Sequence, residues 1–151
     1  MDQTPVFGIY NPTSQYIHRP GVYGLLVNQN CQVAVIQKPD GALFLPGGGL
    51  EAHETSVQGL QREIQEELGC AVLTYQYLAR AHEYSHSPND ETNYFFLNEF
   101  YFIEVDLERV QPAEEDHMVC WVEPCVAREK MMHQSHAWAL DLLNAQSPKS
   151  K

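Results

Sequence analysis

The chain has 151 residues, which corresponds to one domain and is enough to bury a hydrophobic core. Its net charge of −11 argues against long nucleic acid as a partner, because such binding normally requires a basic surface. No apolar segment has the length of a signal-peptide core or a membrane span, and the four cysteines show no CxxC or zinc-ligand spacing. We therefore predict a cytoplasmic protein that forms a single domain over residues 1–151, with its oligomeric state, including a homodimer, left open.

The part of the chain before residue 50 is predicted to contain an irregular arm and a small sheet. Prolines interrupt residues 1–20, which we expect to form the arm. Two apolar runs over 22–27 and 32–37 indicate buried strands. The Pro-Asp-Gly sequence at 39–41 is typical of a turn and precedes a short strand over 42–45.

A helix is predicted between Thr55 and Gly69. Thr55 can cap the first turn together with Gln58 three residues later, and Gly69 can supply the left-handed residue that ends the helix. Gly59 lies inside this helix at a cost of about 1 kcal/mol relative to alanine, which predicts that another backbone passes close to it. Four apolar residues fall on one stripe of the helix: Val57, Leu60, Ile64 and Leu68.

The remainder of the chain is predicted to add three strands and two helices. Strands over 72–79 and 94–105 are separated by a polar loop over 82–93, and a short strand covers 118–122. Pro124 is suited to opening a helix, and apolar residues over 137–143 indicate a final one. The polar segment 146–151 is expected to be frayed. These elements predict an α/β fold, with a mixed β-sheet between helices.

Three carboxylates of the central helix lie close together. Glu66 and Glu67 are three and four residues after Glu63, so both crowd it on the helix surface. Like charges at this distance repel, and a divalent cation or a basic partner would neutralise them. The alternative is a solvated acidic face, which is the usual explanation of a charge run.

The segment 48–70 resembles the Nudix box, G-x5-E-x7-R-E-U-x-E-E-x-G-U, in which U is apolar. The specified positions are occupied by Gly48, Glu54, Arg62, Glu63, Ile64, Glu66, Glu67, Gly69 and Cys70. Cys70 stands where the family usually has Ile, Leu or Val, and a free cysteine behaves as a small hydrophobe. On this segment the chain is identified as similar to MutT-like Nudix hydrolases, which implies an α/β/α sandwich with a mixed β-sheet.

The resemblance also implies a metal site and its supporting residues. It assigns Mg²⁺ or Mn²⁺ to Glu63, Glu66 and Glu67, with the carbonyl oxygen of Gly47 as a further ligand. Arg62 would orient the neighbouring glutamate and pair with Glu54, a task that suits a guanidinium better than an ammonium group. Gly48, Glu54 and Gly69 would serve the motif structurally.

The reaction implied by the resemblance is water attack on phosphorus in a phosphoanhydride of a nucleoside diphosphate derivative. Glu66, Glu63 and Arg62 are then catalytic candidates. The proton acceptor differs among family members and lies either in the box or on a loop before a late strand. The loop here carries acidic residues at 114–116, and spacing from Trp121 favours Glu115. An acidic loop is more often simply solvated.

The substrate is the least determined part of the prediction. We expect a nucleoside triphosphate, including oxidised ones, with dinucleoside polyphosphates second and a non-catalytic nucleotide-binding regulator as the alternative class. Four aromatic residues could stack a base, although aromatics in strands more often belong to the core: Tyr16, Tyr84, Phe95 and Tyr101. Two histidine pairs could suggest another metal site, but we interpret them as loop or surface residues: His82 with His86, and His133 with His136.

Overall fold

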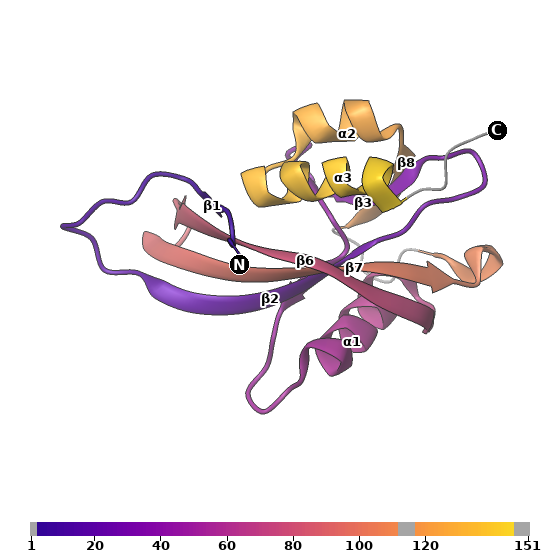
Figure 1. Cartoon of the computed structure of the whole chain (residues 1–151), viewed down its shortest axis with the longest axis horizontal. Coiled ribbons are helices and arrows are strands. Elements are labelled where there is room, and N and C mark those ends of the chain that lie inside the picture. Colours follow the sequence, from indigo (N-terminus) through magenta and orange to yellow (C-terminus); the bar gives the residue numbers. More distant parts are fainter. Residues whose placement is uncertain (1–2, 112–116, 147–151) are drawn as a thin grey trace.

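The computed structural model describes residues 3–111 and 117–146, and within them the strands form two sheets (Figure 1). The larger sheet has the strand order β1 (Val6–Phe7), β6 (Val72–Ser87), β7 (Thr92–Val105), β2 (Ile17–Leu25) and β5 (Gly47–Gly49). The smaller sheet has the order β4 (Leu43–Phe44), β3 (Val33–Gln37) and β8 (Met118–Val122). A short 3₁₀ helix, η1 (Leu107–Arg109), follows β7.

The larger sheet is mixed, as predicted. β2 runs parallel to β7, with Ile17 opposite Tyr94 and Leu25 opposite Phe102. β6 and β7 form a long antiparallel pair, whereas the short β1 is parallel to β6. The two central strands, β2 and β7, therefore come from distant parts of the chain.

Helices cover both faces of the larger sheet. In Figure 1, α1 (Ser56–Leu68) lies below it, and α2 (Pro124–Lys130) and α3 (Gln134–Gln146) lie above it. This arrangement confirms the predicted α/β/α sandwich. Within the described residues, no helix is long and apolar enough to cross a membrane.

The core is divided by the sheet into two clusters. The first contains the buried stripe of α1, with Leu60, Ile64 and Leu68, and includes Cys70. The second packs Leu140 and other residues of α3 against Phe100 of β7. All four cysteines are free thiols.

The predicted ends of α1 are confirmed. Thr55 and Gln58 form a capping box, and Gly69 has the left-handed φ of 71°. The expectation for Gly59 is wrong in one respect, because its neighbours are side chains and not a backbone. A Cβ added at Gly59 would meet Leu50 first and then a carboxylate oxygen of Glu54, at 3.1 Å.

Three predicted boundaries are wrong. The irregular arm over 1–20 contains β1 and the first residues of β2. The polar loop expected over 82–93 is mostly strand, because β6 continues to Ser87. Polar residues pair across this hairpin, and Nδ1 of His86 lies 3.0 Å from Oδ1 of Asn93. α3 begins at Gln134, before the expected residue 137, since its first N–H groups have a distant acceptor in Glu83. Of the tail predicted to fray over 146–151, Gln146 belongs to α3 and the rest lies outside the described residues.

Candidate active site

The glycines of β5 bring the backbone close to the end of α1. Gly47 has a φ of 145°, and a Cβ at this position would run into the carbonyl oxygen of Val22 in β2. Its N–H donates to Oε1 of Glu67 at 2.8 Å. A Cβ at Gly48 would collide with the carboxylate of Glu63. Both box carboxylates therefore lie directly against this strand, which only glycine allows.

Arg62 connects the box loop to the glutamates of α1. Its Nε and Nη2 donate to the two carboxylate oxygens of Glu54, at 2.7 and 2.9 Å. Its Nη1 donates to Oε2 of Glu63 at 2.9 Å, and Nη2 also reaches the carbonyl oxygen of Gly49 at 3.1 Å. The bracing role implied for Arg62 and Glu54 matches this geometry, because only a guanidinium offers so many donors in one plane.

The charges of this network shift its protonation equilibria. The hydrogen bonds from Arg62 lower the pKa of Glu54 to about 2. The same pair raises the pKa of Arg62, so its positive charge is permanent. Burial raises the pKa of Glu63 above its ordinary value, and the nearby Arg62 opposes that shift only in part. Glu63 is therefore a carboxylate that further positive charge would stabilise.

The three predicted metal-binding glutamates are brought to one end of the box but point to different partners. Glu66 is 52% exposed, with Oε1 3.5 Å from Nη1 of Arg62. Glu67 is 11% exposed and contacts the N–H of Gly47, and its Oε2 lies 3.9 Å from Nδ1 of His117. Glu63 is directed to Arg62. Gly47, whose carbonyl oxygen is the further predicted ligand, contacts this cluster through its N–H.

The donor set fits a hard divalent cation such as Mg²⁺. It consists of carboxylates and one backbone carbonyl, oxygen ligands that such ions prefer, and it includes the half-buried carboxylate of Glu63, whose pKa is raised. Among residues 3–111 and 117–146, no three His, Cys, Asp or Glu side chains converge closely enough to form a compact metal centre. In this structure Arg62 donates a hydrogen bond to Glu63, and the N–H of Gly47 donates one to Glu67.

Gly69 lies apart from this cluster. Gly69 ends α1, where a Cβ would be 3.0 Å from the side chain of Gln111, so its place is structural. Glu115, predicted as the general base, lies outside the described residues. The next described residue of that loop, His117, reaches Glu67, which places the end of the loop beside the box.

A cleft of about 200 Å³ opens beside the box on the α3 side of the sheet. It contains Glu67 and the three glycines of β5 on one wall. Further residues of the cleft come from four other segments: Arg19, Tyr23, Lys38, Phe44 and His133. Sequence analysis assigned none of these five residues to the predicted site. Arg19 and Lys38 could have been noticed as cations flanking the predicted first strands of an acidic chain.

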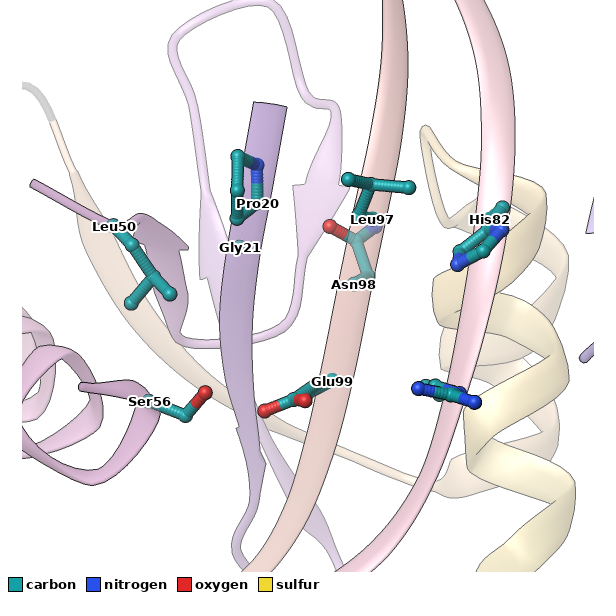
Figure 2. A pocket seen from close by; sticks show the side chains of 9 residues that line it. Pro20, Gly21, Leu50, Ser56, His82, Leu97, Asn98 and Glu99 are labelled. Atoms are coloured by element: carbon teal, nitrogen blue, oxygen red, sulfur yellow. The ribbon is translucent and has the colours of Figure 1, made fainter. Parts of the chain in front are cut away.

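A second cavity, of about 360 Å³, lies on the α1 side of the sheet (Figure 2). Its walls include Leu50, His82 and Leu97, and Figure 2 shows Glu99 extending from β7 toward Ser56 at the start of α1. It is the larger cavity, yet it holds none of the box glutamates. Of these two cavities, the smaller cleft is the one that contains a box glutamate, Glu67.

The aromatic residues singled out from the sequence do not line the cleft. Tyr84 contacts Tyr16 and Phe95, with ring centroids 4.9 and 4.4 Å apart. Tyr101 is 8% exposed and belongs to the α1 core cluster. The interpretation of His136 as a loop or surface residue is wrong, because His136 is 0% exposed. His133 is also largely enclosed, with a side chain that is 17% exposed.

Comparison with known proteins agrees with this geometry. A family model described as the NUDIX domain matches residues 17–143. The chain belongs to the NUDIX family and is a Nudix hydrolase, an enzyme of the pyrophosphohydrolase class. Enzymes of this family act on small nucleotide substrates and generally use divalent metals.

Individual relatives support the same class. A MutT-like protein from Streptomyces ambofaciens is 28% identical over 144 residues, which cover 90% of this chain and 84% of the relative. The MutT NUDIX hydrolase of Burkholderia pseudomallei has a similar structure, with a TM-score of 0.64 and 20% identity over 83% of this chain and 97% of that one. The dihydroneopterin triphosphate pyrophosphohydrolase of E. coli gives a TM-score of 0.63 at 15% identity, covering 85% and 96%. At such low identity, the two structures establish a shared fold only.

Proposed function

We propose that the protein hydrolyses a phosphoanhydride bond of a nucleoside triphosphate, including oxidised forms, with Mg²⁺ as its cofactor and Mn²⁺ as a substitute. The observation that carries this proposal is the pairing of opposite charges across one cleft. Glu67 lies on its box wall, while Lys38 and Arg19 line the same cleft. A polyphosphate chain needs both cationic side chains and cation-binding carboxylates.

The cations of the cleft also lie over aromatic rings. Nζ of Lys38 is 4.8 Å from the centre of the Phe44 ring, and the guanidinium carbon of Arg19 is 5.8 Å from that of Tyr94. These contacts hold the charges in place at the cleft while leaving their remaining donors available. We assign Lys38 and Arg19 to binding the phosphates, with Phe44 forming part of the wall for the nucleoside.

The roles at the box follow from the contacts described above. Glu63, Glu66 and Glu67, with the carbonyl of Gly47, would hold the cation. When bound, that ion would neutralise phosphate charge, acidify water and stabilise the leaving oxygen. Arg62 fixes Glu63 and the box loop. Glu115 remains our prediction for the group that accepts the proton of the attacking water.

The test is turnover of a substrate panel with Mg²⁺. Nucleoside triphosphates, oxidised nucleotides, dinucleoside polyphosphates and nucleotide sugars would be compared, and products identified by mass spectrometry. We expect triphosphates to be cleaved fastest, with activity abolished in Glu66→Gln. Preferred cleavage of dinucleoside polyphosphates would replace the substrate assignment. Tight nucleotide binding without any turnover would contradict hydrolysis and favour a regulator.

The general base needs a separate measurement. Glu115→Gln should lower kcat by about 10²-fold or more with little change in metal affinity, as expected when a general base is lost. Glu114→Gln is the matched control, because it changes the same acidic loop by one position. Near-normal turnover in Glu115→Gln would eliminate this residue. We further propose that the enzyme works in the cytoplasm on small molecules and not on long nucleic acid.

A further inference from the structure

A buried carboxylate lies behind the cleft, outside the Nudix box. Glu83 of β6 is 5% exposed. It accepts hydrogen bonds from the backbone N–H groups of Gln134, at 3.0 Å, and Ser135, at 2.9 Å. These belong to the first turn of α3, where N–H groups have no partner within the helix and the helix dipole favours a negative charge.

Glu83 is ionised at any pH at which the protein is expected to work. Burial by itself would raise the pKa of this carboxyl group, but the hydrogen bond from the N–H of Ser135, together with the nearby His133 and the Ser135 hydroxyl, lowers it to about 2. An ionised carboxylate can only accept hydrogen bonds. Any polar atom facing it must therefore present a proton.

That requirement determines how His133 is held. Its Nδ1 lies 3.7 Å from Oε2 of Glu83, so the carboxylate favours the form that carries a proton on Nδ1. In the neutral ring with that tautomer, the opposite nitrogen, Nε2, is an acceptor for a ligand. The ring is also fixed by edge contacts with Phe44 and Phe96, at centroid distances of 5.5 and 5.3 Å.

His133 lies among the aromatic residues of the cleft, which also holds Glu67. A second contact holds the start of α3, because Nδ1 of the buried His136 accepts a hydrogen bond from the N–H of Leu45 at 3.2 Å. Leu45 leads through Pro46 into the glycines of β5. The start of α3 is therefore held by β6 on one side and by the approach to the box on the other.

We infer that Nε2 of His133 accepts a hydrogen bond from a donor on the nucleobase of the substrate. Glu83 is the positioning residue that fixes the imidazole ring of His133 for this contact. This inference rests on the proposed function and deepens it. Lys38 and Arg19 bind the phosphates, so the aromatic wall formed by Phe44 and His133, whose rings meet edge to face, is left for the base. An acceptor nitrogen beside such a wall suits an exocyclic amino group or a ring N–H.

The first test compares His133→Phe with the wild type on the best triphosphate of the panel. Phenylalanine keeps the ring packing and removes Nε2. We expect KM to rise about tenfold, the size of one lost hydrogen bond, with kcat nearly unchanged. The variant should also lose the preference for a base with an amino group over the same base without it. His86→Phe, on an exposed part of β6, is the control.

The second test reads the protonated nitrogen of His133 directly by ¹⁵N NMR. We expect the proton on Nδ1 in the wild type, a changed tautomer population in Glu83→Gln, and partial recovery in Glu83→Asp. An Nε2–H tautomer in the wild type would overturn the role of Glu83. An unchanged KM and base preference in folded His133→Phe would overturn the role of His133.

The two proposals can fail separately. If no triphosphate is hydrolysed, the proposed function fails, and binding of non-hydrolysable nucleoside triphosphates with Mg²⁺, measured by calorimetry, then tests His133. Weaker binding by His133→Phe would support the inference even so. Equal binding, or the absence of any binding to the wild type, would overturn it.

Discussion

At the scale of single residues, Arg62 is the centre of the box. It holds Glu54 with two donors and reaches both Glu63 and Glu66 with Nη1. A lysine has one ammonium group on a flexible stem and cannot make these contacts in fixed directions. The position of these carboxylates consequently depends on the shape of the Arg62 side chain as well as on its charge.

We predict that Arg62→Lys lowers kcat/KM by about 10- to 100-fold, as is typical when support for metal ligands is lost. The affinity for Mg²⁺, measured by titration of activity, should fall in parallel. Arg109→Lys is a suitable control, since Arg109 is 78% exposed and pairs with Asp106 at the surface. Equal metal affinity in the two variants would contradict the bracing role.

Gly59 gives a prediction in which packing opposes helix propensity. Alanine is favoured over glycine in a helix by about 1 kcal/mol, yet its Cβ would displace Leu50 and crowd Glu54. We expect Gly59→Ala to destabilise the protein by about 1–3 kcal/mol in urea unfolding, as overpacking does. Gln61→Ala, at an exposed position of α1, should change stability by less than about 0.5 kcal/mol. A stabilised Gly59→Ala would show that Leu50 moves aside freely.

Residues of the site differed in how well the sequence predicted them. The box glutamates, Arg62 and Glu54 could be predicted because their spacing is specified within 23 residues. Glu83 and His133 could not, because a glutamate in one strand and a histidine 50 positions later carry no local sign of their contact. The histidine was for this reason assigned to the surface.

At the scale of elements, α1 was predicted to the residue because both of its ends are encoded locally. The extent of the β6–β7 hairpin was not predicted. Polar residues such as His86 and Asn93 are typical of a loop when each is considered alone, and they form a strand pair only when placed opposite each other. The start of α3 was missed for the same kind of reason. Its N-terminal N–H groups are satisfied by Glu83, which is distant in sequence.

The anchoring of α3 predicts a pH dependence of stability. Burial and the proximity of His133 hold the pKa of His136 well below its ordinary value of 6.5. In the unfolded chain this histidine takes up a proton as the pH falls below about 6.5, whereas the folded protein does not. The free energy of unfolding should therefore decrease from pH 7 to pH 5, by at most about 1.4 kcal/mol per pH unit from this group.

Urea unfolding of the wild type and His136→Phe at several pH values would measure this contribution. The variant should be less stable at pH 7.5, because it leaves the N–H of Leu45 without its acceptor. Its stability should nevertheless fall less steeply toward pH 5. Glu83 acts in a lower range, because its lowered pKa gives stability that is lost only as the pH falls from about 4.5 toward 2. Parallel slopes for the two proteins would exclude His136 as the cause.

At the scale of the whole molecule, two core clusters share one sheet. Leu60 of α1 is 0% exposed on one face, and Leu140 of α3 is 3% exposed on the other. β2 and β7 supply residues to both clusters, so neither face can lose its packing without disturbing these strands. The two faces are expected to unfold together.

We predict that Leu60→Ala and Leu140→Ala each lower the free energy of unfolding by about 2–5 kcal/mol in a single transition. The two tryptophans report on the two faces separately, because Trp121 packs against the first cluster and Trp138 against the second. Single-tryptophan variants should therefore give coincident unfolding curves. Two distinct midpoints would show that the faces unfold independently.

The pairing of β2 with β7 has a consequence for how the protein is made. A nascent chain can form α1 as soon as the box has left the ribosome, but Ile17 finds its partner only when Tyr94 has followed. Until then β2 can pair only with the short β5 of its two neighbours in the sheet, and contacts of such long sequence separation form slowly. Synthesis should therefore pass through a stage in which α1 exists but the sheet that supports it does not. At this stage the chain is most exposed to aggregation or to binding by chaperones.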